Sequence, residues 1–192
     1  LMRCLQRPVA LTADIAFCLR PTQKTLNVLS ALSWIREQHQ SGRTLVGVNI
    51  SHHIFSVVPQ LTMKQLKDIY VSSLTELSLK DDNVSFVFVP HAFNEGVNDL
   101  TLAETVLDGM PKQLKSRSLI VSSCRAAEIH TLCAELDMAL SGRMHFAIAC
   151  LSRGIPVACV TYQDKFEGLL KPFGLEGLTI DPEVSLQPGK LI

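Results

Sequence analysis

Short apolar runs alternate with amphipathic stretches of helical length along most of this chain. The apolar runs predict strands, and they lie at 44–50, 84–89, 118–121, 138–141, 156–162 and 178–180. The amphipathic stretches predict helices, and they lie at 23–40, 63–78, 100–110, 126–136, 143–153 and 165–173. Strands that alternate with helices are typical of repeated βαβ units and of a parallel sheet.

Capping residues support the first two helices. Thr22 is expected to cap the helix over 23–40, and Gly42 stands just beyond its end. Thr62 is expected to cap the next helix. Because the crossovers of a parallel sheet are right-handed, the helices should cover both of its faces. The pattern therefore predicts an α/β fold with a Rossmann-like, doubly wound parallel sheet.

Length and composition suit one folded unit. The chain has 192 residues, of which 47% are hydrophobic, enough for a full core. It starts with Leu and runs at once into sequence typical of a domain interior, so we expect an N-terminal part to be missing. On that view residues 1–42, with a short strand and a turn over 9–19 and then a helix, connect from a missing N-terminal lobe. Residues 43–192 form the C-terminal lobe.

Charge and cysteine usage exclude several classes of protein. The chain carries 18 Lys+Arg and 18 Asp+Glu, and 6% of its residues are aromatic, which argues against a nucleic-acid binder. The six cysteines form no CxxC pair, which argues against a zinc ribbon or a redox motif. We expect buried thiols in a reducing, cytoplasmic compartment. No apolar run approaches the ~18 residues of a membrane span, and the N-terminus does not resemble a signal peptide.

Polar residues follow five of the predicted strands. In open α/β sheets ligands bind beyond the carboxyl ends of the strands, next to helix N-termini that attract anions. The segments at that edge are 49–52, 90–94, 122–125, 141–145 and 162–165. All five carry His, Arg or Lys, so we expect the site to bind an anion.

The segment with the most informative chemistry begins a helix. Arg143 and His145 stand at the N-terminal end of a stretch that is apolar on every face from Phe146 onward. A cation there opposes the helix dipole by about 0.3–1 kcal/mol unless an anion is bound. Guanidinium, imidazole and free backbone N–H groups together suit phosphate or carboxylate. In the other interpretation, Arg143 pairs with Asp137 or Glu128, and His145 is a core histidine whose hydrogen bonds are satisfied.

Other ligand motifs are missing from the sequence. Gly47 lies inside a predicted strand without the glycines of a dinucleotide fingerprint, and there is neither a Walker motif nor a GxSxG motif. The neighbouring His52 and His53 would point to opposite sides of an extended segment, which disfavours a metal site. We expect no metal and no resident cofactor.

An ordered set of residues in the last third of the chain resembles the C-terminal signature of the polysaccharide pyruvyl transferase family. The set comprises Asp137, Arg143-Met144-His145, Gly154-Ile155-Pro156 and Tyr162-Gln163-Asp164-Lys165. Sparser likeness, at 12–17, 46–51 and 89–91, extends the resemblance over roughly residues 9–175. Met144 stands where this family more often has Leu or Tyr, and the helix over 23–40 is not part of the pattern.

The resemblance implies a fold and an activity. The fold is the two-lobed one of B-type glycosyltransferases (GT-B), with this chain as the C-terminal lobe. The activity is transfer of pyruvate from phosphoenolpyruvate to two hydroxyls of a sugar as a ketal, in polysaccharide biosynthesis. The implied partners are phosphoenolpyruvate, a sugar or lipid-linked saccharide acceptor and the chain's own N-terminal lobe.

The resemblance also implies roles for individual residues. Arg143 would clamp the phosphate or carboxylate, and Lys165 would add charge at the rim. Either His145 or His91 would be the acid. The remaining candidates are Asn49 and Ser51, which would orient donor or acceptor, and Asp137 and Glu128, which would hold Arg143.

Two alternatives stay open. The chain could be the donor lobe of a nucleotide-sugar glycosyltransferase or 2-epimerase, which also has an anion-binding helix after a late strand. It could instead be a non-catalytic Rossmann-like module, in which case replacing Arg143 and His145 would change no activity.

Overall fold

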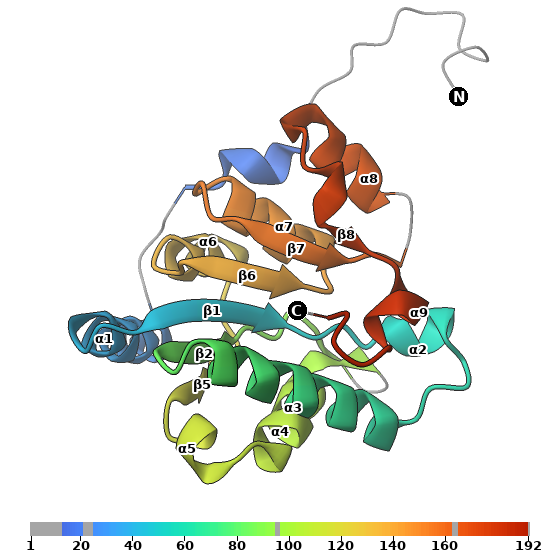
Figure 1. Ribbon diagram of the computed structural model, residues 1–192. Coiled ribbons are helices and arrows are strands. Elements are labelled where there is room, and N and C mark those ends of the chain that lie inside the picture. Colours follow the sequence, from blue (N-terminus) through green and yellow to red (C-terminus); the bar gives the residue numbers. More distant parts are fainter. Residues whose placement is uncertain (1–12, 21–24, 95–96, 163–164, 192) are drawn as a thin grey trace, which may run out of the picture.

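The computed structural model describes residues 13–20, 25–94, 97–162 and 165–191, and their core is a parallel sheet (Figure 1). The sheet has six strands in the order β5-β2-β1-β6-β7-β8, and every pairing in it is parallel. The strands are β1 (Thr44–Asn49), β2 (Val84–Phe88), β5 (Ser118–Ile120), β6 (Met138–Ser141), β7 (Val157–Val160) and β8 (Thr179–Ile180). The predicted fold class, a doubly wound α/β sheet, is confirmed.

Helices pack on both faces of the sheet. One face is covered by α1 (Leu26–Gln40), α6 (Ala126–Cys133), α7 (Met144–Leu151) and α8 (Lys165–Leu170). The other face is covered by α2 (Ile54–Val57), α3 (Met63–Lys80), α4 (Asp99–Gly109) and α5 (Lys112–Lys115). Successive residues of a strand point to opposite faces, so Leu45 enters the first core while Val46 and Val48 enter the second. Both faces of β1 are therefore buried, as expected for a central parallel strand.

Capping chemistry sets the helix starts. Thr62 caps α3 in a reciprocal capping box with Gln65, as predicted. The N-cap of α1 is Thr25, three residues beyond the predicted Thr22, which lies outside the described residues. Gly42 follows α1 with φ of 73°, a conformation that glycine adopts without the steric cost of a Cβ.

The part of the predicted N-terminal strand and turn that the structure describes contains no strand. Residues Ile15–Cys18 form a 3₁₀ turn, capped by the Asp14 carboxylate, and 9–11 lie outside the described residues. Helix α1 packs its buried residues, Val28, Ala31, Leu32 and Ile35, into the first core of this lobe. The division of the chain at residue 42 stays a prediction.

Several short elements carried no sequence signal that we used. A two-stranded hairpin, β3 (Phe93–Asn94) and β4 (Val97–Asn98), precedes α4. Helix α5 follows Pro111, and α9 (Pro182–Ser185) follows β8. No helix in the described ranges is both long and apolar enough to cross a membrane.

The strand order reverses between β1 and β6. From β1 the chain moves outward to β2 and then β5, and it returns to the other side of β1 with β6 (Figure 1). Asn49 and Ser141 are paired at the carboxyl ends of these two strands. Such a switch point opens a crevice at the carboxyl edge of the sheet, where open α/β proteins bind ligands.

Candidate functional site

The turn from β6 into α7 lies at this switch point and is tied to β1. The Gly142 N–H donates to Asn49 O over 2.9 Å. A Cβ at Gly142 would lie 2.9 Å from both the Cβ and the backbone N of Ser51, so only glycine permits this approach. The Ser141 hydroxyl donates to Arg143 O over 2.7 Å and accepts from Arg143 N over 3.2 Å. Arg143 is consequently fixed as the N-cap of α7.

A bidentate ion pair holds the Arg143 side chain. Its Nε donates to Asp99 Oδ2 over 3.0 Å, and its Nη2 donates to Asp99 Oδ1 over 2.8 Å. The Arg143 side chain is 15% exposed and that of Asp99 is fully buried. Fork-to-fork geometry of this kind fixes the plane of the guanidinium as well as its position.

The Asp99 carboxylate also organises two backbone segments. It accepts hydrogen bonds from His52 N, after β1, and from His91 N and Ala92 N, after β2, over 3.1–3.3 Å. Asp99 is the first residue of α4, where a negative charge is favoured by the helix dipole. One buried carboxylate therefore fixes Arg143 and two strand-end loops.

A cavity of about 250 Å³ opens at the N-terminal end of α7. Five polar side chains and two apolar side chains line its wall. The polar ones are His91, Arg143, His145, Tyr162 and Lys165, and the apolar ones are Met144 and Phe166. Four of the predicted site residues, Arg143, His145, His91 and Lys165, therefore line one cavity.

His91 is partly buried in the wall of the cavity. Burial lowers the pKa of its imidazole to about 4, a shift that the Asp99 carboxylate and the Val89 carbonyl only partly offset. Its Nδ1 lies 3.4 Å from Val89 O, and its ring packs edge-on against Phe146. At neutral pH His91 is therefore an uncharged hydrogen-bonding group in the wall of the cavity.

Two polar side chains of the wall are exposed to solvent. His145, in the first turn of α7, and Lys165, the first residue of α8, are both exposed. Tyr162, at the end of β7, packs edge-on against Phe166, and burial raises the pKa of its hydroxyl. The cavity thus opens to solvent at His145 and Lys165.

His53 stands beside this cavity. Its ring lies 5.2 Å from that of Tyr162, centroid to centroid. Burial and, next, the charge of Arg143 lower the pKa of its imidazole. No cluster of three His, Cys, Asp or Glu side chains suited to a metal occurs among the described residues.

Asn49 and Ser51 do not reach the cavity wall. The Asn49 side chain is fully buried, and its Nδ2 donates to Val89 O over 2.7 Å, which ties the end of β1 to the end of β2. The Ser51 hydroxyl is buried beside Gly142 and accepts from His53 N over 3.3 Å. Their contacts position the strand ends beneath the site.

The expectation that Asp137 and Glu128 hold Arg143 is wrong, because Asp99 does so. Asp137 precedes β6 at the opposite edge of the sheet, where its Oδ2 accepts from Leu45 N over 2.7 Å and lies 3.2 Å from His39 Nε2. Glu128 accepts from Arg125 N and Thr25 N, and these two N–H groups lower the pKa of its carboxyl. Glu128 therefore joins the starts of α1 and α6.

Two residues were missed as site residues. Asp99 carried a usable signal, because an acid at a helix start after a strand at the ligand edge is a candidate partner for Arg143. Tyr162 was noted in the family pattern and given no role there. The contact with Arg143 itself had no sequence signal, since 44 residues separate the two partners.

Comparison with protein-family models finds no match, and comparison with curated proteins finds none either. Solved structures do match. An S. aureus MnaA-UDP co-structure is 12% identical with a TM-score of 0.54, over 82% of this chain and 36% of that one. A mutant O-GlcNAc transferase from Thermobaculum terrenum is 13% identical with a TM-score of 0.50, over 76% and 27%. A family 9 glycosyl transferase from Veillonella parvula DSM 2008 is 12% identical with a TM-score of 0.49, over 87% and 51%.

These matches concern the fold. The chain spans about half or less of the length of each matched structure. Its α/β domain, with an all-parallel six-stranded sheet, has the fold of one lobe of the GT-B transferases.

Proposed function

We propose that this chain is the donor-binding lobe of a two-lobed, sugar-modifying transferase whose donor is phosphoenolpyruvate. In that reaction the enolpyruvyl group forms a ketal with two sugar hydroxyls, and the phosphate is released. The observation that carries the proposal is the cavity at the start of α7, where Arg143, Lys165 and His145 converge on a small volume. The family pattern of residues 137–165 supports the same donor.

The charge and size of the cavity suit a small dianion. Arginine has five N–H donors, and two of those on Arg143 are used by Asp99, so three remain for a ligand. The Lys165 ammonium and the first backbone N–H groups of α7 add to the positive potential. A volume of about 250 Å³ is below the ~300–1,000 Å³ usual for sites of drug-sized ligands. Phosphoenolpyruvate, a three-carbon molecule with a phosphate and a carboxylate, suits the positive charge and the small volume of this cavity.

The two histidines divide the chemistry under this proposal. His145 is the acid that protonates the methylene carbon or assists phosphate departure, because it is exposed at the mouth of the cavity. His91 accepts or donates a hydrogen bond as a neutral imidazole, since burial lowers its pKa to about 4. Asp99 acts through Arg143 and is a positioning residue.

A nucleotide-sugar donor is the second candidate, and the fold comparison favours it. Two of the matched structures named above are an MnaA-UDP complex and an O-GlcNAc transferase. A second, apolar cavity of about 510 Å³ adjoins the first and shares Met144 and Lys165 with it. In this proposal the diphosphate occupies the cationic cavity, and the base or sugar extends into the apolar one.

Ligand-dependent thermal unfolding of the chain separates the two candidates. A ligand at about 100 times its Kd stabilises the folded state by ~2.7 kcal/mol, or roughly 5–10 °C for a chain of this length. Phosphoenolpyruvate should give such a shift while UDP-sugars give none. Stabilisation by UDP-sugars alone would establish the second candidate in place of the first, and no response to either would contradict both.

A further inference from the structure

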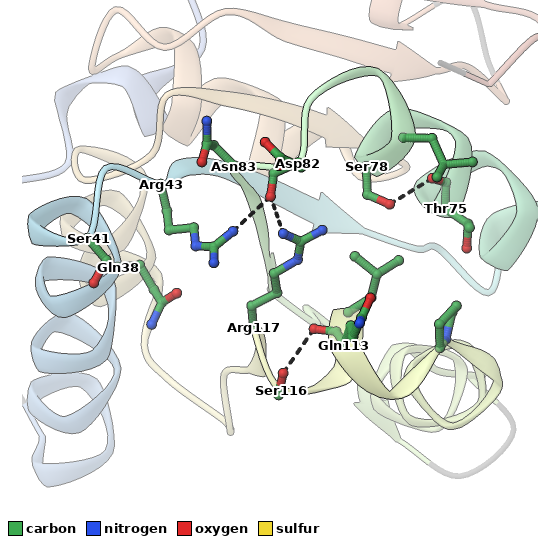
Figure 2. Close-up of a pocket in the computed structure, with 13 residues that line it drawn as sticks. Gln38, Ser41, Arg43, Thr75, Ser78, Asp82, Asn83, Gln113, Ser116 and Arg117 are labelled. Atoms are coloured by element: carbon green, nitrogen blue, oxygen red, sulfur yellow. Dashed lines mark hydrogen bonds between the residues drawn. The ribbon is translucent and has the colours of Figure 1, made fainter.

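A further cavity lies at the opposite edge of the sheet, away from the proposed donor site. Its volume is about 840 Å³. It is open to solvent and is bordered by the end of α1, the start of β1, the last turns of α3 and the α5–β5 segment (Figure 2). Six residues of β1 separate its Arg43 from the donor-site edge, a span of roughly 20 Å. The two cavities share no lining residue.

Two guanidinium groups meet in this cavity. Figure 2 shows Arg43, just before β1, and Arg117, just before β5, directed toward one backbone oxygen, that of Asp82. Arg43 Nη1 donates to this oxygen over 2.8 Å, and Arg117 Nη1 donates to the same atom. Both cations therefore crowd a single neutral acceptor.

No carboxylate compensates either arginine directly. Among the described residues, neither Arg43 nor Arg117 has a carboxylate oxygen within 4.0 Å, and the acidic side chain in the cavity wall is that of Asp82. Burial and, next, the charge of Arg43 lower the pKa of Arg117, while Asp82 and Asp81 act in the opposite direction. The wall carries two positive charges against one negative charge.

Two buried polar atoms of wall residues have no hydrogen-bond partner in the part of the chain that the structure describes. They are Arg117 Nε, a donor, and Thr75 Oγ1, a donor and acceptor. Buried polar atoms in folded proteins are nearly always paired, with protein, water or a bound ion. The C-terminal ends of α1 and α3 carry a partial negative charge, which explains why cations gather at this edge. It does not explain why Arg43 and Arg117 share one acceptor, or why Arg117 Nε has no partner.

We propose that this cavity is a second anion site, which binds the phosphoryl group of a small polyhydroxylated phosphate ester between Arg43 and Arg117. Arginine forks match phosphate oxygens in two-point fashion. The rest of the wall offers the hydroxyls and amides that hydrogen-bond a sugar: Gln38, Ser41, Thr75, Ser78, Asn83, Gln113 and Ser116. The volume of about 840 Å³ accommodates a phosphorylated sugar, within the ~300–1,000 Å³ usual for ligand sites.

The test is an NMR titration of the ¹⁵N-labelled chain in phosphate-free buffer, observing the Nε–Hε signals of Arg43 and Arg117. The probes are glucose 1-phosphate, inorganic phosphate and glucose. We expect glucose 1-phosphate to shift both signals with the highest affinity, and inorganic phosphate to shift them more weakly. Phosphate binding as tightly as the ester would overturn the assignment of a sugar phosphate, and no shift with either anion would overturn the site. In that case water alone satisfies Arg117.

Three variants test whether the signal shifts arise from binding in this cavity. Arg117→Gln should weaken binding of glucose 1-phosphate by about tenfold or more, since charge-assisted hydrogen bonds are lost. Asp82→Asn keeps the shared backbone acceptor and removes the negative charge, so it should tighten binding by about threefold. It serves as the test if Arg117→Gln fails to fold. His145→Gln, in the donor cavity, should leave the shifts of Arg43 and Arg117 unchanged, and a loss of these shifts in that variant would overturn the independence of the site.

Discussion

The guanidinium of Arg143 and the carboxylate of Asp99 are joined by two hydrogen bonds, of 3.0 and 2.8 Å, between the N-terminal ends of α7 and α4. The pair brings the crossover that follows β2 into contact with the turn that follows β6. Because Asp99 also fixes the loops after β1 and β2, it sets the geometry of the whole carboxyl edge.

Replacing Asp99 with Asn should destabilise the protein. The amide removes the negative charge and leaves Arg143, 15% exposed, with an incomplete partner. Breaking a buried pair from one side costs about 3–5 kcal/mol. Urea unfolding of Asp99→Asn and of the wild-type chain measures the difference in their free energies of unfolding.

Asp108→Asn is the matched control for this change. Asp108 pairs with Lys115 over 3.3 Å, but its side chain is 85% exposed. Surface pairs contribute at most about 1 kcal/mol, so this variant should unfold close to the wild type. Equal losses in the two Asp→Asn variants would show that burial of the Arg143 pair has no special effect.

Gly142→Ala should lower stability by about 1–3 kcal/mol. The new Cβ would lie 2.9 Å from the backbone N of Ser51, so β1 and the β6–α7 turn would have to separate. Gly168→Ala is the control, because a Cβ at that helical position meets nothing within 4 Å. The measurement is the free energy of unfolding of both variants. A neutral Gly142→Ala would mean that the turn is not tightly held.

Acid should destabilise the protein through His91. Burial lowers the pKa of its imidazole from 6.5 to about 4, so between these values the unfolded chain takes up a proton that the folded chain refuses. Stability is fully present above about pH 6.5 and falls as the pH decreases toward 4. Between about pH 7.5 and about pH 5, protonation of His91 should lower the free energy of unfolding by about 1–2 kcal/mol.

His91→Gln isolates this contribution. His53 and His130 also have pKa values lowered first by burial, so the variant should retain part of the pH dependence. Urea unfolding at the two pH values should give a smaller difference for His91→Gln than for the wild type. An identical difference would show that His91 is protonated as readily in the folded protein as in the unfolded chain.

Thiol alkylation of the native chain should follow exposure. Cys18 is exposed, whereas Cys133, Cys150 and Cys159 are buried. Burial raises the pKa of Cys159 to about 12, which removes its reactive thiolate. Mass spectrometry after brief treatment with iodoacetamide should find Cys18 modified and these three unmodified. Early modification of Cys159 would contradict the packing of β7.

Periodicity predicted the fold because parallel strands and the helices that cover them have strong local patterns. The apolar run at 44–50 indicates a buried strand. Thr62 marks the start of one helix, and Gly42 marks the end of another. The short elements were missed because residues such as Phe93 and Lys112 belong to segments too short to show a period. Tertiary contacts stabilise such segments.

The site was predictable as far as the strand-end rule applies. That rule gathered Arg143, His145, His91 and Lys165, and the structure brings them to one cavity. It does not identify the partners of a charge. Arg143 could have met any carboxylate in the chain, and Asp137 was nearer in sequence than Asp99, but β6 carries Asp137 to the far edge of the sheet.

The most direct test of the donor-site proposal is calorimetric titration of the chain with phosphoenolpyruvate, in the wild type and in three charge variants. His145→Gln and Lys165→Gln change exposed side chains of the cavity wall, so the fold should persist. Lys171→Gln is the control, because Lys171 is exposed on the next turn of the chain and does not line the cavity.

The account predicts that phosphoenolpyruvate binds the wild type and the Lys171→Gln variant equally well. It predicts that binding weakens by about tenfold in His145→Gln and in Lys165→Gln, which corresponds to ~1.4 kcal/mol for each lost contact. Equal binding by all four proteins, or no binding by the wild type, would contradict a donor site at the start of α7.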